Sequence, residues 1–237
     1  MSKRVDTKRA ARAARAAREQ LARRRRRTMW TSIVAAVALV LAGGAGYGVY
    51  RARQPAQGMA TPAGATADRT GISVGTGPVV VEIFLDYLCP ACQRFEADAY
   101  DELKAYLDQN RITLVVHPVA ILDRYSTNRY STRSAVSAGC AADAGKIFEY
   151  GQALYARQPA EGGPGHTDEE LIRIGASVGL DASFAQCVRD DRYHDWVTHV
   201  TGSMVGRNVT GTPTVFVGGR QLSRPSASTL TAAVDAA

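Results

Sequence analysis

The hydrophobic pattern just before the middle of the chain predicts a strand, a helix and a second strand. Residues 78–85 are nearly all apolar, as in a buried central strand. The next apolar residues recur at helical spacing: Phe95, Ala99, Leu103 and Leu107. A second apolar run, 112–116, begins just after Asn110, where the helix is expected to end. Strand, helix and strand in this order imply a parallel pair joined by a right-handed crossover.

From residue 131 to about residue 208 the pattern is helical, and it predicts an inserted block of helices. The expected helices are 131–144, 147–156, 168–178, 182–189 and 192–206. Strand signals return at 214–217 and 220–222, and a closing helix is expected at 226–236. The domain over residues 78–237 is therefore predicted to be α/β, with a sheet of roughly four strands interrupted by the insert.

The first 50 residues are typical of a basic tail followed by one transmembrane helix. Residues 1–28 are rich in Lys and Arg, and residues 29–50 are apolar, with no charge between Trp30 and Tyr50. This length can cross a bilayer. The excess of basic residues before it predicts a cytoplasmic N-terminus and an extracytoplasmic C-terminal domain. A cleaved signal peptide is the alternative, and it also places the domain outside the cytoplasm.

Residues 51–77 contain mostly small residues and proline, which predicts a flexible linker between membrane and domain. A short ordered strand near 72–74 is the alternative. The formal net charge of +7 comes from the tail, because the rest of the chain has more acidic than basic residues. This distribution argues against nucleic-acid binding by the domain.

The candidate chemistry lies in Cys89-Pro90-Ala91-Cys92, where the first strand ends and the helix begins. Free N–H groups and the helix dipole stabilise an anion at such a position, so a thiol there has a lowered pKa. Cys89 is expected to be the exposed thiolate. Cys92, one turn later, is expected to be buried and close enough to form a disulfide with Cys89. The two cysteines can then switch between the dithiol and the disulfide form.

Two other interpretations of this motif are weaker. A zinc site needs further close ligands, and neither Cys140, Cys187 nor any histidine supplies a second ligand pair. A structural disulfide between Cys89 and Cys92 would close almost no loop and would stabilise little. We therefore expect no metal and no organic cofactor.

The domain resembles the DsbA-type disulfide oxidoreductases of the thioredoxin superfamily, in particular membrane-anchored actinobacterial members. The match rests on the stretch from Asp86 to Cys92 with Phe95-Glu96, on the long helical insert, and on 211–214 before a strand. The resemblance implies a thioredoxin-like fold. It also implies that Cys89 is the attacking sulfur and that Cys92 resolves the mixed disulfide.

The resemblance further implies a substrate-binding region of four residues: Pro90, Ala91, Thr212 and Pro213. Pro213 is expected to be cis and to face the cysteines, while the Thr212 backbone pairs with a substrate strand. The remaining cysteines, Cys140 and Cys187, are expected to form a structural disulfide in an oxidising compartment. The alternative is a second redox pair that relays electrons.

The sequence departs from the family pattern at two positions. Ala91 replaces a histidine of the strongly oxidising members, so the Cys89 thiolate loses one stabilising group. Ile83 stands where relatives place a buried acid, and the neighbouring Glu82 should face the other side of the strand. Asp86 is close enough to lie beside the cysteines or to cap the helix. No proton-shuttle residue is assigned.

These observations predict a membrane-tethered, monomeric enzyme that puts disulfides into reduced secreted proteins. The resemblance implies that a quinone-linked membrane partner reoxidises it. Two alternatives remain open. One is a disulfide reductase or isomerase of the same fold, and the other is a copper metallochaperone that uses Cys89 and Cys92.

Overall fold

The structure, a computed structural model, describes residues 58–237. The predicted basic tail, the predicted transmembrane helix over 29–50 and the first residues of the predicted linker lie outside this range. Within residues 58–237, no helix is both long enough and apolar enough to cross a membrane.

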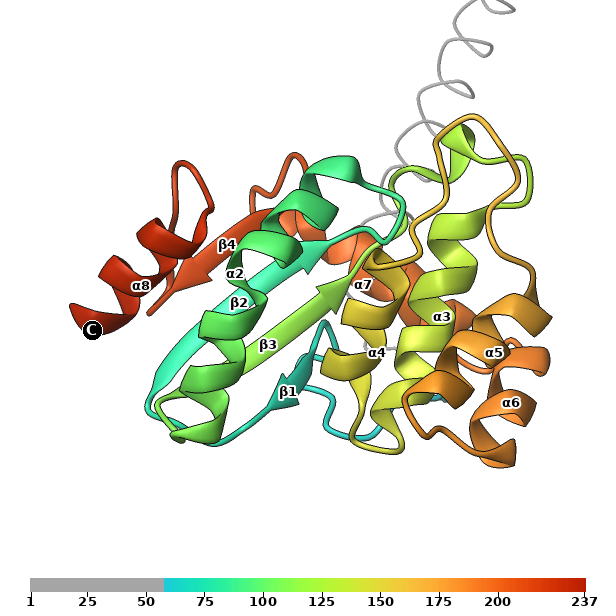
Figure 1. Ribbon diagram of the computed structural model, residues 1–237, viewed down its shortest axis with the longest axis horizontal. Coiled ribbons are helices and arrows are strands. Elements are labelled where there is room, and N and C mark those ends of the chain that lie inside the picture. The colour runs from blue at the N-terminus through green and yellow to red at the C-terminus, as the bar shows by residue number, and fades with distance from the viewer. Residues whose placement is uncertain (1–57) are drawn as a thin grey trace, which may run out of the picture. The chain divides into compact units, whose positions relative to one another are not determined.

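Five strands form one mixed sheet in the order β1-β3-β2-β4-β5 (Figure 1). The strands are β1 (Ile72–Val74), β2 (Val79–Leu85), β3 (Ile112–Pro118), β4 (Thr214–Val217) and β5 (Arg220–Gln221). The strands β2 and β3 are parallel, as predicted, and the other three pairs are antiparallel. The apolar run that predicted a central strand does lie in the middle of the sheet.

The prediction of a flexible linker over 51–77 is wrong for its last part, because β1 is the short strand near 72–74 that was the alternative, and it belongs to the folded domain. Ile72 is only 2% exposed, and its partner across the strand pair is Val116 of β3. Thr70 is also buried. One large apolar side chain and a backbone ladder along the edge of β3 are enough to order this segment, although its composition is dominated by small residues.

The helix that follows β2 is α2 (Pro90–Asp108), and it crosses one face of the sheet (Figure 1). Its apolar stripe, with Ala99 and Leu103 fully buried, packs toward β3. The closing helix α8 (Ala227–Asp235) packs beside α2 and begins with a capping box formed by Ser226 and Thr229. These contacts fix α2, and therefore its first turn, against the sheet.

The helical insert follows β3. It comprises the short 3₁₀ helix η1 (Asp123–Tyr125), α3 (Tyr130–Ala142), α4 (Ile147–Tyr155), α5 (Asp168–Ser177), α6 (Ala182–Arg189) and α7 (His194–Gly206). Each predicted helix is present within two residues at either end. The helix α3 is the centre of the insert, because it contacts α4, α5, α6 and α7 and is buried on nearly all sides.

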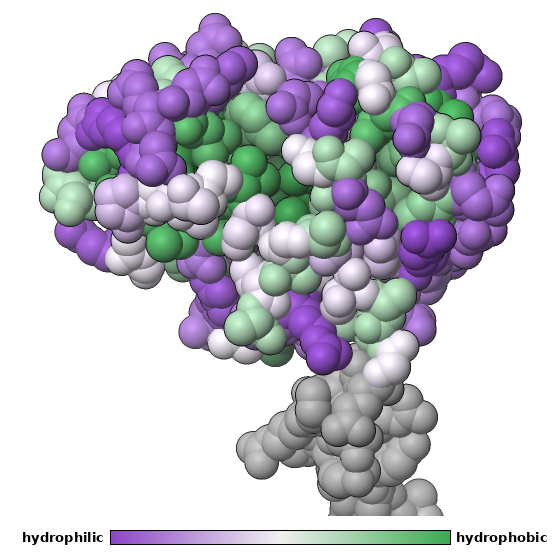
Figure 2. Space-filling view, turned by 90° about the horizontal axis from the view of Figure 1, so that it is seen from below, coloured by the Kyte–Doolittle hydropathy of each residue, from purple (hydrophilic) through white to green (hydrophobic). Residues whose placement is uncertain are grey.

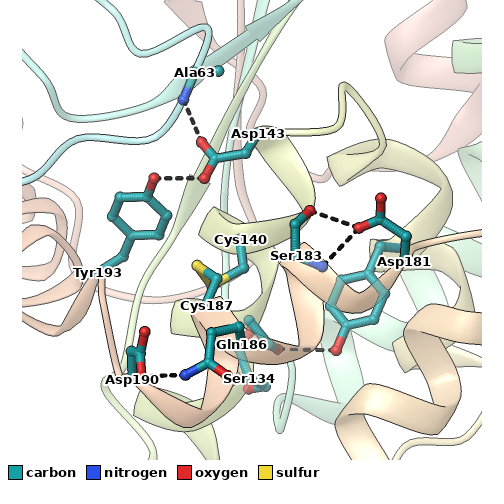
Figure 3. The surroundings of a disulfide bond; sticks show 12 residues. Ala63, Ser134, Cys140, Asp143, Asp181, Ser183, Gln186, Cys187, Asp190 and Tyr193 are labelled. Atoms are coloured by element: carbon teal, nitrogen blue, oxygen red, sulfur yellow. Dashed lines mark hydrogen bonds between the residues drawn. A yellow bond between two sulfur atoms is a disulfide. The ribbon is translucent and has the colours of Figure 1, made fainter.

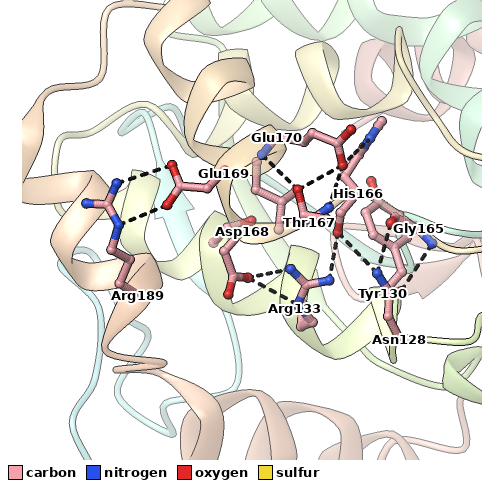
Figure 4. A network of polar contacts seen from close by, with 12 residues as sticks. Asn128, Tyr130, Arg133, Gly165, His166, Thr167, Asp168, Glu169, Glu170 and Arg189 are labelled. Atoms are coloured by element: carbon pink, nitrogen blue, oxygen red, sulfur yellow. Dashed lines mark hydrogen bonds and ion pairs between the residues drawn. The ribbon is translucent and has the colours of Figure 1, made fainter.

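Polar contacts hold the long loop before α5 against α3 (Figure 4). Arg133 of α3 donates to the Asp168 carboxylate and to the backbone oxygen of His166. Thr167 and Glu170 form a capping box at the start of α5, as the sequence predicted. This loop connects α4 to α5 and passes close to the end of β2.

A disulfide joins Cys140 of α3 to Cys187 of α6 (Figure 3). The pairing agrees with the sequence prediction, and both side chains are buried. The closed loop spans 47 residues, which in the chain-entropy model corresponds to about 4 kcal/mol of stabilisation.

The apolar residues of the described part form one continuous core beneath a largely polar surface. Three large hydrophobic side chains are well exposed there: Val80, Tyr125 and Val205. In the view from below, apolar side chains gather in a hollow with hydrophilic residues around it (Figure 2). The strands, α2 and the insert therefore pack as one body.

Candidate functional site

The four residues of the Cys-Pro-Ala-Cys motif form the first turn of α2 at the end of β2. Cys89 is the N-cap residue, and Pro90 follows at the first helical position, where a missing N–H costs nothing. No side chain caps this helix, so the free N–H groups of the first turn point toward the Cys89 sulfur. Cys89 and Cys92 are both thiols in this structure.

The surroundings of Cys89 favour its thiolate. Its pKa falls from 9.0 to about 5, mainly because the Cys92 thiol donates a hydrogen bond to it, against the opposing effect of burial. The Thr212 side chain and the backbone N–H groups of Cys92 and Ala91 add to this stabilisation. The Cys89 pKa is therefore lowered, as the sequence predicted, but the Cys92 thiol contributes more to this than the backbone N–H groups of the helix start.

Cys92 has the opposite character. Burial raises its pKa well above 9.0, and the neighbouring Cys89 thiolate raises it further. The prediction that Cys89 is exposed is wrong: the residue is buried, with 7% of its surface exposed, and is only slightly more exposed than Cys92 at 2%. As a thiol, Cys89 donates to the backbone oxygen of Thr212 at 3.4 Å, and this loop covers it. The site therefore combines a reactive Cys89 thiolate with a protonated Cys92 thiol.

The loop that covers Cys89 contains the cis peptide bond Thr212–Pro213, as predicted. Next to it lies an open groove of about 440 Å³. Its lining residues are Ala91, Arg94, Phe95, Asp98, Pro213 and Pro225. Of the four residues predicted to bind substrate, Ala91 and Pro213 line the groove, Thr212 touches Cys89, and Pro90 is exposed at the rim of the motif.

Asp86 organises the turn between β2 and α2 without capping the helix. One carboxylate oxygen accepts hydrogen bonds from Leu88 N and Ser131 Oγ, and the other accepts from the backbone N–H groups of Ile121 and Leu122. Burial still raises its pKa to about 6. Asp86 therefore ties the loop before Cys89 to the start of the insert.

A second connection between the insert and this loop comes from Gln158, which no sequence pattern singles out. Its side-chain amide donates to the backbone oxygens of Tyr87 at 2.9 Å and Cys89 at 3.1 Å. Tyr155, at the end of α4, donates to the backbone oxygen of Asp86 at 3.2 Å. These contacts span about 70 residues of chain, and only the folded insert brings them together.

The opposite face of the sheet carries a separate polar cluster. Glu82 points to that face, as predicted, and its carboxylate accepts a hydrogen bond from the Arg207 guanidinium at 2.6 Å. Contacts with His117 and then Arg207 lower the Glu82 pKa to about 2. His117 stacks on Phe84 with ring centroids 4.0 Å apart and bonds the Thr70 oxygen, so it is a packing residue and does not contact Cys89. In the described part of the chain, no three His, Cys, Asp or Glu side chains are grouped to hold a metal ion.

The comparisons with known proteins agree with this geometry. A family model described as thioredoxin matches residues 69–236. The crystal structure of reduced DsbA from Mycobacterium tuberculosis is 27% identical, covers 70% of this chain and 91% of its own, and superposes with a TM-score of 0.63. The reduced form of DsbG from the same organism is 27% identical and covers 76% and 84%, with a TM-score of 0.60.

Among curated proteins, a putative protein-disulfide oxidoreductase of Rickettsia bellii is 25% identical over 162 residues. The match covers 67% of this chain and 60% of that protein's length. The family model spans most of the chain and contains the Cys-Pro-Ala-Cys motif, the insert and the cis-proline loop. The chain therefore belongs to the thioredoxin family, as a member of the DsbA type.

Proposed function

We propose that this protein is a thiol–disulfide oxidoreductase that introduces disulfides into secreted proteins. One observation carries the proposal: the motif holds a thiolate at Cys89, with a pKa of about 5, over a protonated thiol at Cys92. A site that stabilises the reduced form so strongly makes the disulfide a good oxidant. The groove beside Ala91 and Pro213 offers room for an extended peptide next to the reactive sulfur.

The proposed cycle uses only protein thiols. A substrate thiolate attacks Cys89 in the oxidised pair, the bond between Cys89 and Cys92 breaks, and Cys92 leaves as a thiolate that takes up a proton. A second substrate thiolate then attacks the substrate sulfur of the mixed disulfide. Cys89 leaves as a thiolate, which is easy because its pKa is low. The substrate gains a disulfide and the enzyme gains two electrons.

The location of this activity is part of the proposal. The apolar segment 29–50, with a basic tail before it, supports a single membrane anchor with the domain on the extracytoplasmic side. The disulfide between Cys140 and Cys187 supports an oxidising compartment. We further propose that the enzyme acts as a monomer and that a quinone-linked membrane protein reoxidises it.

A reductase or isomerase is the second candidate. It is favoured by Ala91, since a histidine at that position would stabilise the Cys89 thiolate further. The similarity to DsbG, described as a disulfide bond oxidoreductase, leaves the direction of electron flow open and is as close in sequence as the similarity to DsbA. The two candidates share the site and differ in the direction of electron flow.

The reduction potential of the Cys89–Cys92 pair separates these candidates. The full-length protein is equilibrated with defined ratios of reduced and oxidised glutathione, and the dithiol fraction is measured by alkylation and mass spectrometry. A value close to that of DsbA, about −120 mV, is expected for an oxidase. A value close to that of thioredoxin, about −270 mV, would overturn the proposal in favour of a reductase.

A further inference from the structure

Cys92 needs a proton each time the Cys89–Cys92 bond opens and must lose it each time the bond closes. Its sulfur is buried, and its pKa is raised well above 9.0. Water in bulk solution does not reach it directly. On β2, Ile83 has no titratable group and Glu82 lies on the opposite face with Arg207, so the strand supplies no group that could exchange this proton.

A small cavity lies behind the first turn of α2. Its volume is about 20 Å³, and Ile83, Tyr87, Glu96 and Tyr155 are among the residues that line it. This is enough for one water, which needs roughly 10–15 Å³. The Tyr87 hydroxyl is buried and has no hydrogen-bond partner in the described part of the chain. An added Cβ at Gly151 would lie 3.3 Å from that hydroxyl, so the glycine leaves this space open.

Glu96 connects this cavity to the outside. Its side chain is 8% exposed, and it lines both the small cavity and an open groove of about 430 Å³ between α2 and α4. The groove is also lined by Gln93, Tyr100 and Gln152. One carboxyl group can therefore exchange protons with solvent on one side and with the cavity on the other.

Glu96 is also close to Cys92. The two residues are four apart on α2 and so lie on the same face, one turn from each other. Tyr87 and Tyr155 line the cavity together with Glu96, and each of the two tyrosines also interacts electrostatically with Cys92. The carboxyl enters this space from the helix, while Ile83 borders it from the strand.

We infer that Glu96 of α2 carries the proton to and from Cys92. The inference rests on the proposed thiol–disulfide exchange and adds a residue to it. Glu96 does not touch the substrate; it acts through Cys92, which lies one turn away on the same face of α2.

The charges around Glu96 suit this task. The cavity side presents Tyr87 and Tyr155, and Cys92 lies one turn away on α2; all three side chains are neutral when protonated. The groove side presents Arg94, Tyr100 and Asp101, and Glu149 of α4 lies near Tyr100. None of the described residues gives the Glu96 carboxylate a hydrogen bond, and burial raises its pKa to about 7. Both protonation states are thus populated near neutral pH.

The proton balance is simple in both directions. When a substrate thiolate attacks Cys89, the electron pair of the broken disulfide goes to Cys92 Sγ, and the Glu96 carboxylic acid donates its proton to that sulfur. When a disulfide of a partner protein oxidises Cys89 to a mixed disulfide, the Glu96 carboxylate accepts the Cys92 proton. The Cys92 thiolate then attacks Cys89, and the partner leaves as a thiolate.

The test uses the full-length protein in detergent, with the pair reduced, and a rapid mix with oxidised glutathione. Acid quenching and mass spectrometry follow the mixed disulfide between Cys89 and glutathione, whose decay reports the attack by Cys92. In Glu96→Gln we expect this decay to slow by roughly 10²-fold at pH 7. We expect the wild-type decay rate to show an inflection near pH 7 and the variant to lack it. The pH titration of Cys89 alkylation should stay in place.

Two further variants make the result specific. Glu149→Gln removes an exposed carboxylate near the same groove and should leave the decay unchanged. Ile83→Glu combined with Glu96→Gln returns an acid to the same cavity from the strand and should restore part of the rate. Thermal unfolding of each variant establishes that it is folded.

The outcomes are distinguishable. If the wild-type pair does not exchange with glutathione, the proposed function fails. If the wild type exchanges and Glu96→Gln decays at the wild-type rate between pH 5 and pH 9, the inference about Glu96 is wrong. A parallel shift of the Cys89 titration would also overturn it, because the charge would then act on Cys89 and not on the Cys92 proton.

Discussion

The two cysteine pairs of this domain have the same chemistry and opposite surroundings. Cys89 and Cys92 are three residues apart at the start of a helix, beside a cis-proline loop and an open groove. Cys140 of α3 and Cys187 of α6 are 47 residues apart in the sequence, and both residues are buried. The first pair bonds with almost no change in chain entropy, and its reduced form is stabilised by a thiolate. The second pair closes a long loop and has no charged alternative. Reactivity therefore follows from where the backbone places the sulfur.

The strongest way to test this contrast is to remove the second sulfur of each pair. In Cys92→Ala, a substrate that attacks or is attacked by Cys89 cannot be released, so we expect mixed disulfides to accumulate and turnover to cease. The trapped species are detected on non-reducing gels and by mass spectrometry. The matched change in the other pair, Cys187→Ala, should trap no substrate. Trapping by both variants would mean that the insert also carries a redox-active pair.

The next largest effect is on stability. Replacing Cys140 and Cys187 together by serine should lower the free energy of unfolding by about 4 kcal/mol, because the unfolded chain regains the freedom of a 47-residue loop. For a domain of this size the unfolding midpoint should fall by roughly 10 °C. Thiol–disulfide exchange at Cys89 should be retained. Loss of exchange in a variant that is still folded would instead support the electron-relay alternative.

The pH dependence of stability sharpens the comparison further. The Cys89 pKa is lowered to about 5 in the folded protein, so its contribution is fully present above the unfolded value near 9 and is lost as the pH falls through about 5. The unfolding midpoint of the reduced form, relative to the form with an oxidised active-site pair, should therefore rise between pH 5 and pH 8. The raised pKa values of Asp86 and Glu96 act in the opposite direction in both forms and largely cancel.

The pH-dependent difference between the unfolding midpoints of the two redox forms should come from Cys89 and Cys92 alone. Cys140 and Cys187 do not titrate while they are bonded, so replacing both by serine should lower both midpoints and leave their pH-dependent difference unchanged. Differential scanning fluorimetry on the two redox forms at several pH values measures it. A flat difference between pH 5 and pH 8 would contradict the low Cys89 pKa.

Local patterns predicted most of the fold, and tertiary contacts account for what they missed. Helix boundaries and the parallel strand pair follow from apolar spacing over ten to twenty residues, and the redox motif follows from the strand–helix junction. The roles of Glu96 and Gln158 could not be predicted in this way. In the sequence, Glu96 is one residue of a motif that resembles a family. Only the packing of α4 against α2 makes it a lining residue of a groove. The order around Ile72 depends on the edge of β3, 44 residues later.

The smallest predicted effect concerns the hydrogen bonds that connect the helical insert, which contains Cys140 and Cys187, to the loop that contains Cys89. Gln158→Ala removes both hydrogen bonds to the backbone oxygens of Tyr87 and Cys89. The Cys89 oxygen keeps its bond from Gln93 N, so we expect a loss of only about 1–2 kcal/mol in the free energy of unfolding. Because the first turn of α2 is then held less rigidly, its N–H groups stabilise the Cys89 thiolate less, and the Cys89 pKa should rise by less than about one unit. The control is Gln152→Ala, an exposed glutamine of α4. If the two variants show the same Cys89 titration in thiolate absorbance, the insert supports the active-site loop without tuning its sulfur.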